Sequence, residues 1–166
     1  YDEHIYMFSI TSIQKIFKIF DFELIDVLPQ GTHGGSMRYI VARKNQRSIN
    51  KRVYDGLRFE KEKKFDDEES CLKFKIDCEK SKKYIIESLT KYKDMGKSIA
   101  GYAATSKSTT ILNYCNINNS IIDFICDTTK DKIGKYSPGM HIPIVAASEF
   151  KNNFPDIAYL FAWNHK

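Results

Sequence analysis

The chain has 166 residues, 42% of them hydrophobic and 13% aromatic, which is enough for one ordinary domain with a core or for two small lobes. Lys and Arg number 26 against 21 Asp and Glu, giving a net charge of +5, and no apolar run approaches the roughly 20 residues that span a bilayer. These values exclude a disordered chain and a membrane protein, and the start has no signal-peptide layout, so we expect a folded cytoplasmic protein without a membrane partner.

The basic residues do not predict a nucleic-acid partner. They are mostly Lys interleaved with acids between residues 44 and 97, which is typical of a solvated helical face, and no basic stripe alternates with stacking aromatics. The cysteines form no C-x-x-C pair, which argues against a zinc site. We expect all four to be buried, reduced thiols: Cys71, Cys78, Cys115 and Cys126.

The first part of the chain predicts a small helix–strand–strand lobe. Residues 11–20 carry apolar side chains at helical spacing, behind Ser9 and Thr11 as candidate caps. Residues 23–27 and 37–42 are short apolar runs joined by the breaker-rich segment PQGTHGG, and each run predicts a strand.

The middle of the chain predicts a charged segment followed by a long helix. Residues 45–67 are polar and charged, which indicates a loop with some helix. The acidic cluster at residues 66–69 suits a helix N-terminus, a ragged apolar stripe follows, and Gly96 is placed to end the helix. We therefore expect one helix over residues 67–95.

The last part of the chain alternates short apolar strands with helices, the rhythm of a parallel α/β unit. Strands are expected at residues 99–103, 121–126, 142–146 and 157–163, with helical segments at 107–114 and 148–150. The predicted fold class is α/β, a Rossmann-like parallel sheet with flanking helices, preceded by the long helix and the small lobe and truncated at both ends. We divide the chain into residues 1–43, 44–95 and 96–166.

The turn GYAATSKSTT after the first of these strands is a candidate phosphate site. Small residues from Gly101 onward would let a phosphate approach the N–H groups at the helix start, and Lys107 adds positive charge. Asp127 ends the next strand, near the place of a ribose-binding acid in a dinucleotide fold. Because the turn has one Gly instead of three and no G-K-[ST], a plain strand-to-helix turn is the alternative.

Two further polar segments are candidates. In THGGSMR, paired glycines permit close backbone approach and His33, Ser36 and Arg38 offer polar groups, although a hairpin connection without function explains the segment equally well. In YDEH at the start, His4 is suited to removing a proton and Tyr1 to donating to an oxyanion, with a chain end without function as the alternative.

Taken together and in this order, these segments resemble the C-terminal half of the sugar C-methyltransferase family, enzymes that methylate a carbon of a deoxysugar carried by a nucleotide diphosphate. The likeness covers nearly the whole chain and rests on the segments YDEHIYMFS, THGGSMR, GYAATSK, LNYC, DTTKDK, GKY, PG, HIPI and WN. One departure is Ala103, which stands where the family has the second Gly of Gly-Tyr-Gly and narrows access to the backbone.

The resemblance implies that a nucleotide-diphosphate-sugar is enclosed between this Rossmann-like unit and an S-adenosylmethionine domain upstream of this chain, with zinc in a further upstream module. The family's catalytic Tyr and His fall on Tyr1 and His4, with Glu3 beside them; His4 would be the base and Tyr1 would assist at the enolate. The matching motifs place substrate-binding residues at His33, Gly34, Ser36, Arg38, Tyr102, Lys107, Asn113, Tyr136 and His141.

The expected function is therefore the nucleotide-sugar-binding portion of an S-adenosylmethionine-dependent C-methyltransferase that acts on a keto-deoxysugar, inactive as this piece alone. Three alternatives remain open from the residues. They are a non-catalytic Rossmann-like module for a nucleotide or nucleotide-sugar, an O- or N-methyltransferase of the same family, and a scaffold domain built on the long helix.

Overall fold

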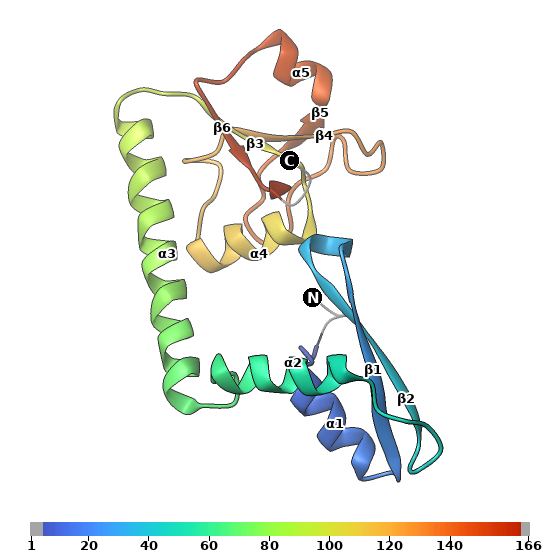
Figure 1. Cartoon of the computed structure of the whole chain (residues 1–166). Coiled ribbons are helices and arrows are strands. Elements are labelled where there is room, and N and C mark those ends of the chain that lie inside the picture. Colours follow the sequence, from blue (N-terminus) through green and yellow to red (C-terminus); the bar gives the residue numbers. More distant parts are fainter. Residues whose placement is uncertain (1–4, 164–166) are drawn as a thin grey trace. The chain divides into compact units, whose positions relative to one another are not determined.

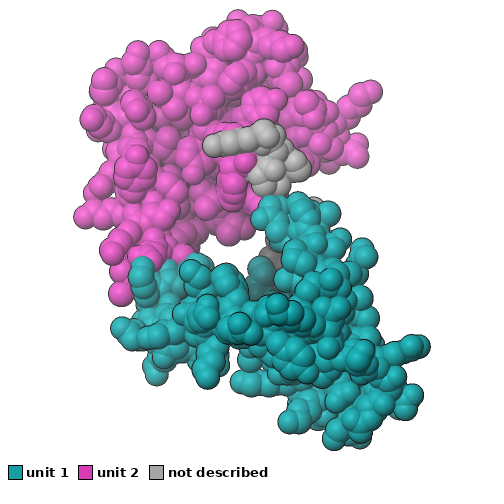
Figure 2. Space-filling model, viewed as in Figure 1, with its two compact units in different colours: residues 1–75 teal, residues 76–166 magenta. Residues whose placement is uncertain are grey.

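The computed structural model describes residues 5–163. It divides into two compact units, the first up to Lys75 and the second from Ile76 (Figure 2). Helix α3 (Glu68–Asp94) runs across this division and confirms the long helix expected from the sequence. Gly96 follows it with a positive φ of 74°, the left-handed conformation in which glycine commonly ends a helix.

The first unit is a two-stranded antiparallel hairpin covered by two helices (Figure 1). Its elements are α1 (Ile10–Lys18), β1 (Phe22–Gln30), η1 (Thr32–Gly34), β2 (Ser36–Arg43) and α2 (Lys51–Glu62). The predicted helix–strand–strand lobe is confirmed, and Ser9 caps α1 in a capping box. Where the charge pattern indicated a loop with some helix, α2 forms twelve helical residues because Val53 is fully buried against the hairpin.

The second unit is a parallel α/β unit, as the alternating pattern predicted. Its sheet contains β3 (Ile99–Tyr102), β4 (Phe124–Asp127), β5 (Ile144–Ala146) and β6 (Ile157–Leu160), in the order β5-β4-β3-β6 with every neighbouring pair parallel. Helix α4 (Ser106–Cys115) joins β3 to β4, and α5 (Ala147–Asn152) joins β5 to β6.

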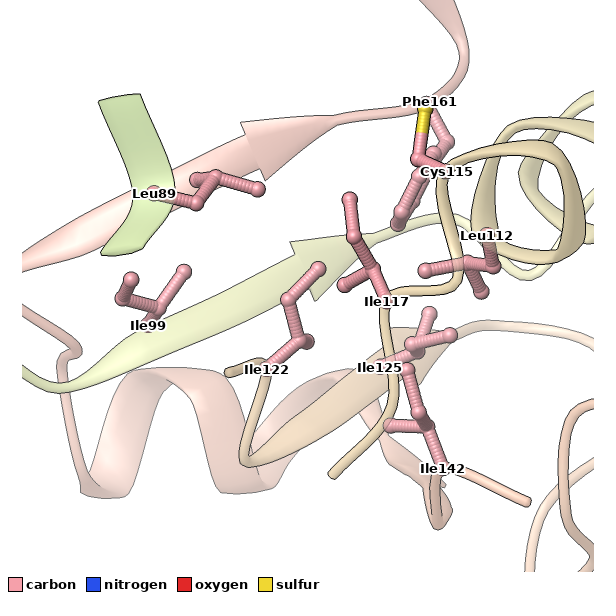
Figure 3. Close-up of a cluster of buried hydrophobic side chains, with 9 residues drawn as sticks. All are labelled: Leu89, Ile99, Leu112, Cys115, Ile117, Ile122, Ile125, Ile142 and Phe161. Atoms are coloured by element: carbon pink, nitrogen blue, oxygen red, sulfur yellow. The ribbon is translucent and has the colours of Figure 1, made fainter. Parts of the chain in front are cut away.

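The two connecting helices lie on opposite faces of this sheet (Figure 1). Successive side chains of a strand point to opposite faces, so Gly101 and Tyr102 of β3 face different helices. The Gly101 face packs against α3 and α4 around a buried cluster (Figure 3) made of Leu89, Ile99, Leu112, Cys115, Ile117, Ile122, Ile125, Ile142 and Phe161. The Tyr102 ring instead meets Phe150 of α5.

Candidate functional site

The strand order of the second unit marks one end of the sheet as the candidate site. The chain passes from β3 to β4 and β5 on one side and then returns to place β6 on the other side of β3. In open parallel sheets, ligands bind outside the carboxyl ends of the strands where the order reverses in this way. That point lies between the ends of β3 and β6, beside the start of α4.

Aromatic side chains gather at the end of β3. The Tyr102 ring packs edge-on against Phe150 with centroids 5.7 Å apart, and Phe150 packs in the same way against Phe154 at 5.8 Å. Tyr102 is 43% exposed and Phe154 is exposed, so the row presents an apolar surface to solvent. Such rings provide stacking area together with one hydroxyl group that can form hydrogen bonds.

Lys107 and Trp163 meet at the start of α4. The Lys107 ammonium lies 5.7 Å from the centroid of the Trp163 ring, within the range of a cation–π interaction. Trp163 follows the end of β6 and is 45% exposed. The sequence predicts Lys107 as a substrate-binding residue but not Trp163, because nothing local to the WN segment indicates which helix the indole ring reaches.

The turn between β3 and α4 is tight and is hydrogen-bonded to the end of the neighbouring strand β4. Ala103 has a φ of +73° and donates its N–H to Cys126 O at 2.9 Å. Thr105 is the N-cap of α4, and its hydroxyl accepts the Ser108 N–H at 3.2 Å. Gly101, which suggested room for a phosphate, has another use: a Cβ built there would lie 2.7 Å from the Phe161 ring. The core therefore requires this glycine for packing.

Asp127 holds the same turn from the neighbouring strand. Its side chain is buried, and its carboxylate accepts the Ala104 and Thr129 N–H groups, each at 2.8 Å, and the Lys132 ammonium at 3.3 Å. Burial alone would raise the pKa of Asp127, but these hydrogen bonds and the Lys132 charge outweigh it, and the pKa is lowered. The oxygens that a ribose would need already accept hydrogen bonds from within the protein.

Three other predicted substrate residues lie on a different part of the second unit. Residues 128–143 join β4 to β5 as a hairpin-like loop in which Ser137 N–H donates to Ile142 O at 2.9 Å. Tyr136 and His141 are exposed on this loop, and the Asn113 amide on α4 donates to Pro138 O at 3.0 Å.

Geometry separates these three residues from the carboxyl edge of the sheet. Helix α4 runs antiparallel to the strands that it connects, and Asn113 lies seven residues after Ser106, about 10 Å further along the helix axis. The Asn113 side chain is in addition packed so closely against Gly139 that an added Cβ would lie 1.9 Å from its Oδ1. The structure thus places Tyr102, at the end of β3, and Lys107, at the start of α4, at the same carboxyl edge but next to different faces of the sheet. It places Asn113, with the loop that it holds, toward the other end of α4.

The remaining described candidates belong to the turn of the first unit. Gly34 ends η1 with a φ of +86°, and the Ser36 hydroxyl donates to Thr32 O at 3.2 Å. Ser36 and Arg38 are exposed and share one face of β2, since side chains alternate along a strand. The backbone of His33 lies in the same turn, but its side chain is outside the described part of the chain, as are Tyr1, Glu3 and His4.

The described residues form neither a metal site nor a membrane-spanning helix. No group of three or more His, Cys, Asp or Glu side chains within residues 5–163 is arranged to hold a metal ion. No helix in the same range combines the length and apolar character needed to cross a bilayer.

Two of the four expected buried thiols are buried, Cys115 and Cys126, whereas Cys71 is exposed and Cys78 is half-buried on α3. The prediction of burial is wrong for Cys71 and Cys78, because the long helix α3 on which they lie is largely exposed to solvent.

Known proteins match this chain over most of its length. A family described as the C-methyltransferase C-terminal domain matches residues 31–166. The C-methyltransferase NovU of Streptomyces niveus is 30% identical over 166 residues, an alignment that includes 99% of this chain and 40% of NovU. The chain therefore spans 40% of the length of this relative.

Proposed function

The chain belongs to the C-methyltransferase C-terminal domain family, and on that premise we propose that it forms the nucleotide-sugar-binding part of an S-adenosylmethionine-dependent methyltransferase. The proposed substrate is a keto-deoxysugar linked to a nucleotide diphosphate, and the proposed acceptor is a carbon atom next to the ketone. One observation supports this use most directly. At the reversal of strand order, the end of β3, the start of α4 and the Lys107–Trp163 pair lie together.

The groups at this edge suit a nucleotide diphosphate. The start of α4 carries the positive end of the helix dipole, and Lys107 in the first turn adds a full positive charge, so a diphosphate is favoured there. Tyr102 and Trp163 offer half-exposed ring faces on which a base or a sugar stacks. The predicted substrate residues of the other two clusters, including Arg38 and Asn113, stay predictions.

Two cofactors belong to the proposal but not to the described residues. S-adenosylmethionine supplies an electrophilic methyl group when it is bound. The β3–α4 turn has Ala103 and Ala104 where the loop of a nucleotide cofactor has glycines, so the residues present do not fit a methyl-donor site. We assign S-adenosylmethionine and zinc to domains upstream of this chain.

Proton transfer is assigned to three residues before the described part of the chain. His4 removes the proton from the carbon next to the sugar ketone, which leaves an enolate on the sugar and a proton on the imidazole. Tyr1 donates a hydrogen bond to the enolate oxygen, and Glu3 orients the imidazole and stabilises its charge. The ketone makes this step feasible because it delocalises the negative charge onto oxygen.

Binding of the diphosphate is tested with the chain as it is. Titration calorimetry with thymidine and uridine diphosphate should show binding, and Lys107→Met should weaken it about tenfold, the usual cost of losing one charge-assisted contact. Lys91→Met on the last turn of α3, at the amino edge of the sheet, is the matched control and should bind normally. A wild-type chain that binds neither diphosphate contradicts the proposed role of this edge.

The proton-transfer role of His4 is tested in the full-length protein. In deuterated water, the acidic hydrogen of the keto-sugar should exchange with solvent, as followed by NMR. His4→Ala should slow this exchange at least about a hundredfold, the contribution typical of a positioned base. Exchange that continues at the wild-type rate would remove His4 from the role of base, and binding without any exchange in the wild type would favour a non-catalytic module.

A further inference from the structure

The ion pair of Asp127 and Lys132 has no part in the function described so far. Asp127 closes β4 and is 7% exposed, although it carries a charge that the lowered pKa retains at neutral pH. A buried carboxylate loses hydration and must be compensated by hydrogen bonds and by an opposite charge. Here the compensation comes from backbone N–H groups of two loops and from Lys132.

The N–H and the carbonyl group of Ala104 both form hydrogen bonds with this ion pair. The Ala104 N–H donates to Asp127 Oδ2 at 2.8 Å, and the Ala104 carbonyl accepts from Lys132 Nζ at 2.8 Å. Since donor and acceptor are both engaged, the peptide planes on either side of Ala104 are held in one orientation. Ala103, the residue before, is held in a left-handed conformation that an alanine rarely adopts.

The hydrogen bonds of Asp127 and Lys132 to Ala104 bear on ligand binding because they lie next to the start of α4. Ala104 is followed by Thr105, the N-cap of α4, so the orientation of its peptides determines where the first N–H groups of the helix and Lys107 point. Groups that are held in position before a ligand arrives bind it more tightly, because less conformational entropy is lost on binding. A turn that could relax would also release the strained Ala103.

We propose that Asp127 and Lys132 are positioning residues, which act through Ala104 to hold the β3–α4 turn and the start of α4 in the arrangement that receives the substrate diphosphate. This inference rests on the proposed function. It also assigns Asp127 a use different from that of the acid in a dinucleotide fold, which contacts the ribose directly. Direct contact with the ribose would cost Asp127 one or more of its internal hydrogen bonds.

The decisive comparison is between Asp127 at the carboxyl edge of the sheet and Asp156 at the amino edge, because each carboxylate accepts hydrogen bonds from a backbone N–H and from a lysine. Asp156 accepts hydrogen bonds from the Ser98 N–H and hydroxyl, each at 2.9 Å, and from Lys97 at 3.1 Å, at the amino edge. Asp127→Asn should raise the Kd for thymidine or uridine diphosphate about tenfold, as removal of an orienting contact commonly does. Asp156→Asn should lower the melting temperature and leave that Kd unchanged.

A second pair of variants separates positioning from folding. Lys132→Met should weaken binding as Asp127→Asn does, and Lys132→Arg, which keeps the charge and donors, should restore it at least in part. All titrations are made at a temperature where circular dichroism shows each variant folded. If Asp127→Asn does not fold, the two Lys132 variants decide the question.

The outcomes distinguish the two proposals. A wild-type chain that binds neither diphosphate overturns the proposed function and this role with it. A wild type that binds, with Asp127→Asn and Lys132→Met folded and unchanged in Kd, overturns the positioning role alone. Equal loss of binding in Asp127→Asn and Asp156→Asn would show a general effect of stability, and would likewise overturn it.

Discussion

Ala103 adopts a φ of +73° at the turn that leads into α4. For a residue with a Cβ, this left-handed conformation costs roughly 1–2 kcal/mol relative to the right-handed one, whereas glycine adopts it freely. The family resemblance stated from the sequence would place the second glycine of Gly-Tyr-Gly at this position, where the chain has an alanine. The contacts of Asp127 and Lys132 with Ala104 hold the turn in place despite this strain.

Replacing Ala103 with glycine should therefore stabilise the protein. We expect Ala103→Gly to raise the free energy of unfolding by about 1 kcal/mol, because relief of the strained φ exceeds the entropy that glycine adds to the unfolded chain. Ala104→Gly is the matched control, since Ala104 has no positive φ, and should be neutral or destabilising. Urea unfolding followed by circular dichroism measures both. A less stable Ala103→Gly would show that the turn is not strained.

At the scale of elements, a buried carboxylate joins the two helices of the first unit. Glu60 of α2 accepts hydrogen bonds from the N–H groups of Ile10 and Thr11 at 2.6 and 2.8 Å, and from the Thr11 hydroxyl at 2.7 Å. These are the first N–H groups of α1, which have no partner within their own helix. The negative charge also lies at the positive end of the α1 dipole. Glu60 thus completes the N-terminus of α1 and packs it against α2.

Removal of this carboxylate should destabilise the first unit. We expect Glu60→Ala to lower the free energy of unfolding by about 2–3 kcal/mol, because buried N–H donors are left unsatisfied and the charge–dipole attraction is lost. Glu62→Ala, which removes an exposed carboxylate from the same helix, is the control and should change stability by less than about 0.5 kcal/mol. Equal effects of the two substitutions on the urea midpoint would contradict the assigned role of Glu60.

At the scale of the whole molecule, stability depends on carboxylates that are held ionised. Hydrogen bonds from the Ser98 N–H, from Lys97 and from the Ser98 hydroxyl lower the pKa of Asp156 from 3.8 to about 2. The pKa of Asp127 is also lowered, despite its burial. At a pH between the folded and unfolded pKa values the unfolded chain binds more protons, so stability rises with pH. The net charge of +5 grows as other acids are protonated and adds repulsion.

Acid should therefore unfold the protein over a defined range. The contribution of Asp156 is complete above about pH 4 and should be lost as the pH falls toward about 2, the folded pKa. Urea midpoints measured between about pH 6 and about pH 2 should fall in that window. In Asp156→Asn the fall should be shallower, whereas Asp131→Asn, an exposed acid of the same unit, should follow the wild type. A wild-type midpoint that does not change below about pH 4 would rule out this dependence.

Most elements of this protein follow from local sequence. The acidic start and apolar stripe of α3, the Ser9 cap of α1 and the alternation of short strands with helices in the second unit are each encoded within a few residues. Propensity, capping and periodicity act at this range, and they predicted an α/β fold with a small lobe. The motif order likewise indicated the family.

The tertiary structure alone decided the strand order β5-β4-β3-β6, and with it which end of the sheet collects Tyr102, Lys107 and Trp163. It also decided the uses of single residues: Gly101 serves the core, and Asp127 holds Ala104, 23 positions earlier in the chain. A sequence pattern reflects the conformational preferences of a residue and of its neighbours along the chain. Hydrogen-bond partners and close packing between distant segments depend on how the strands pair, and no local signal encodes that pairing.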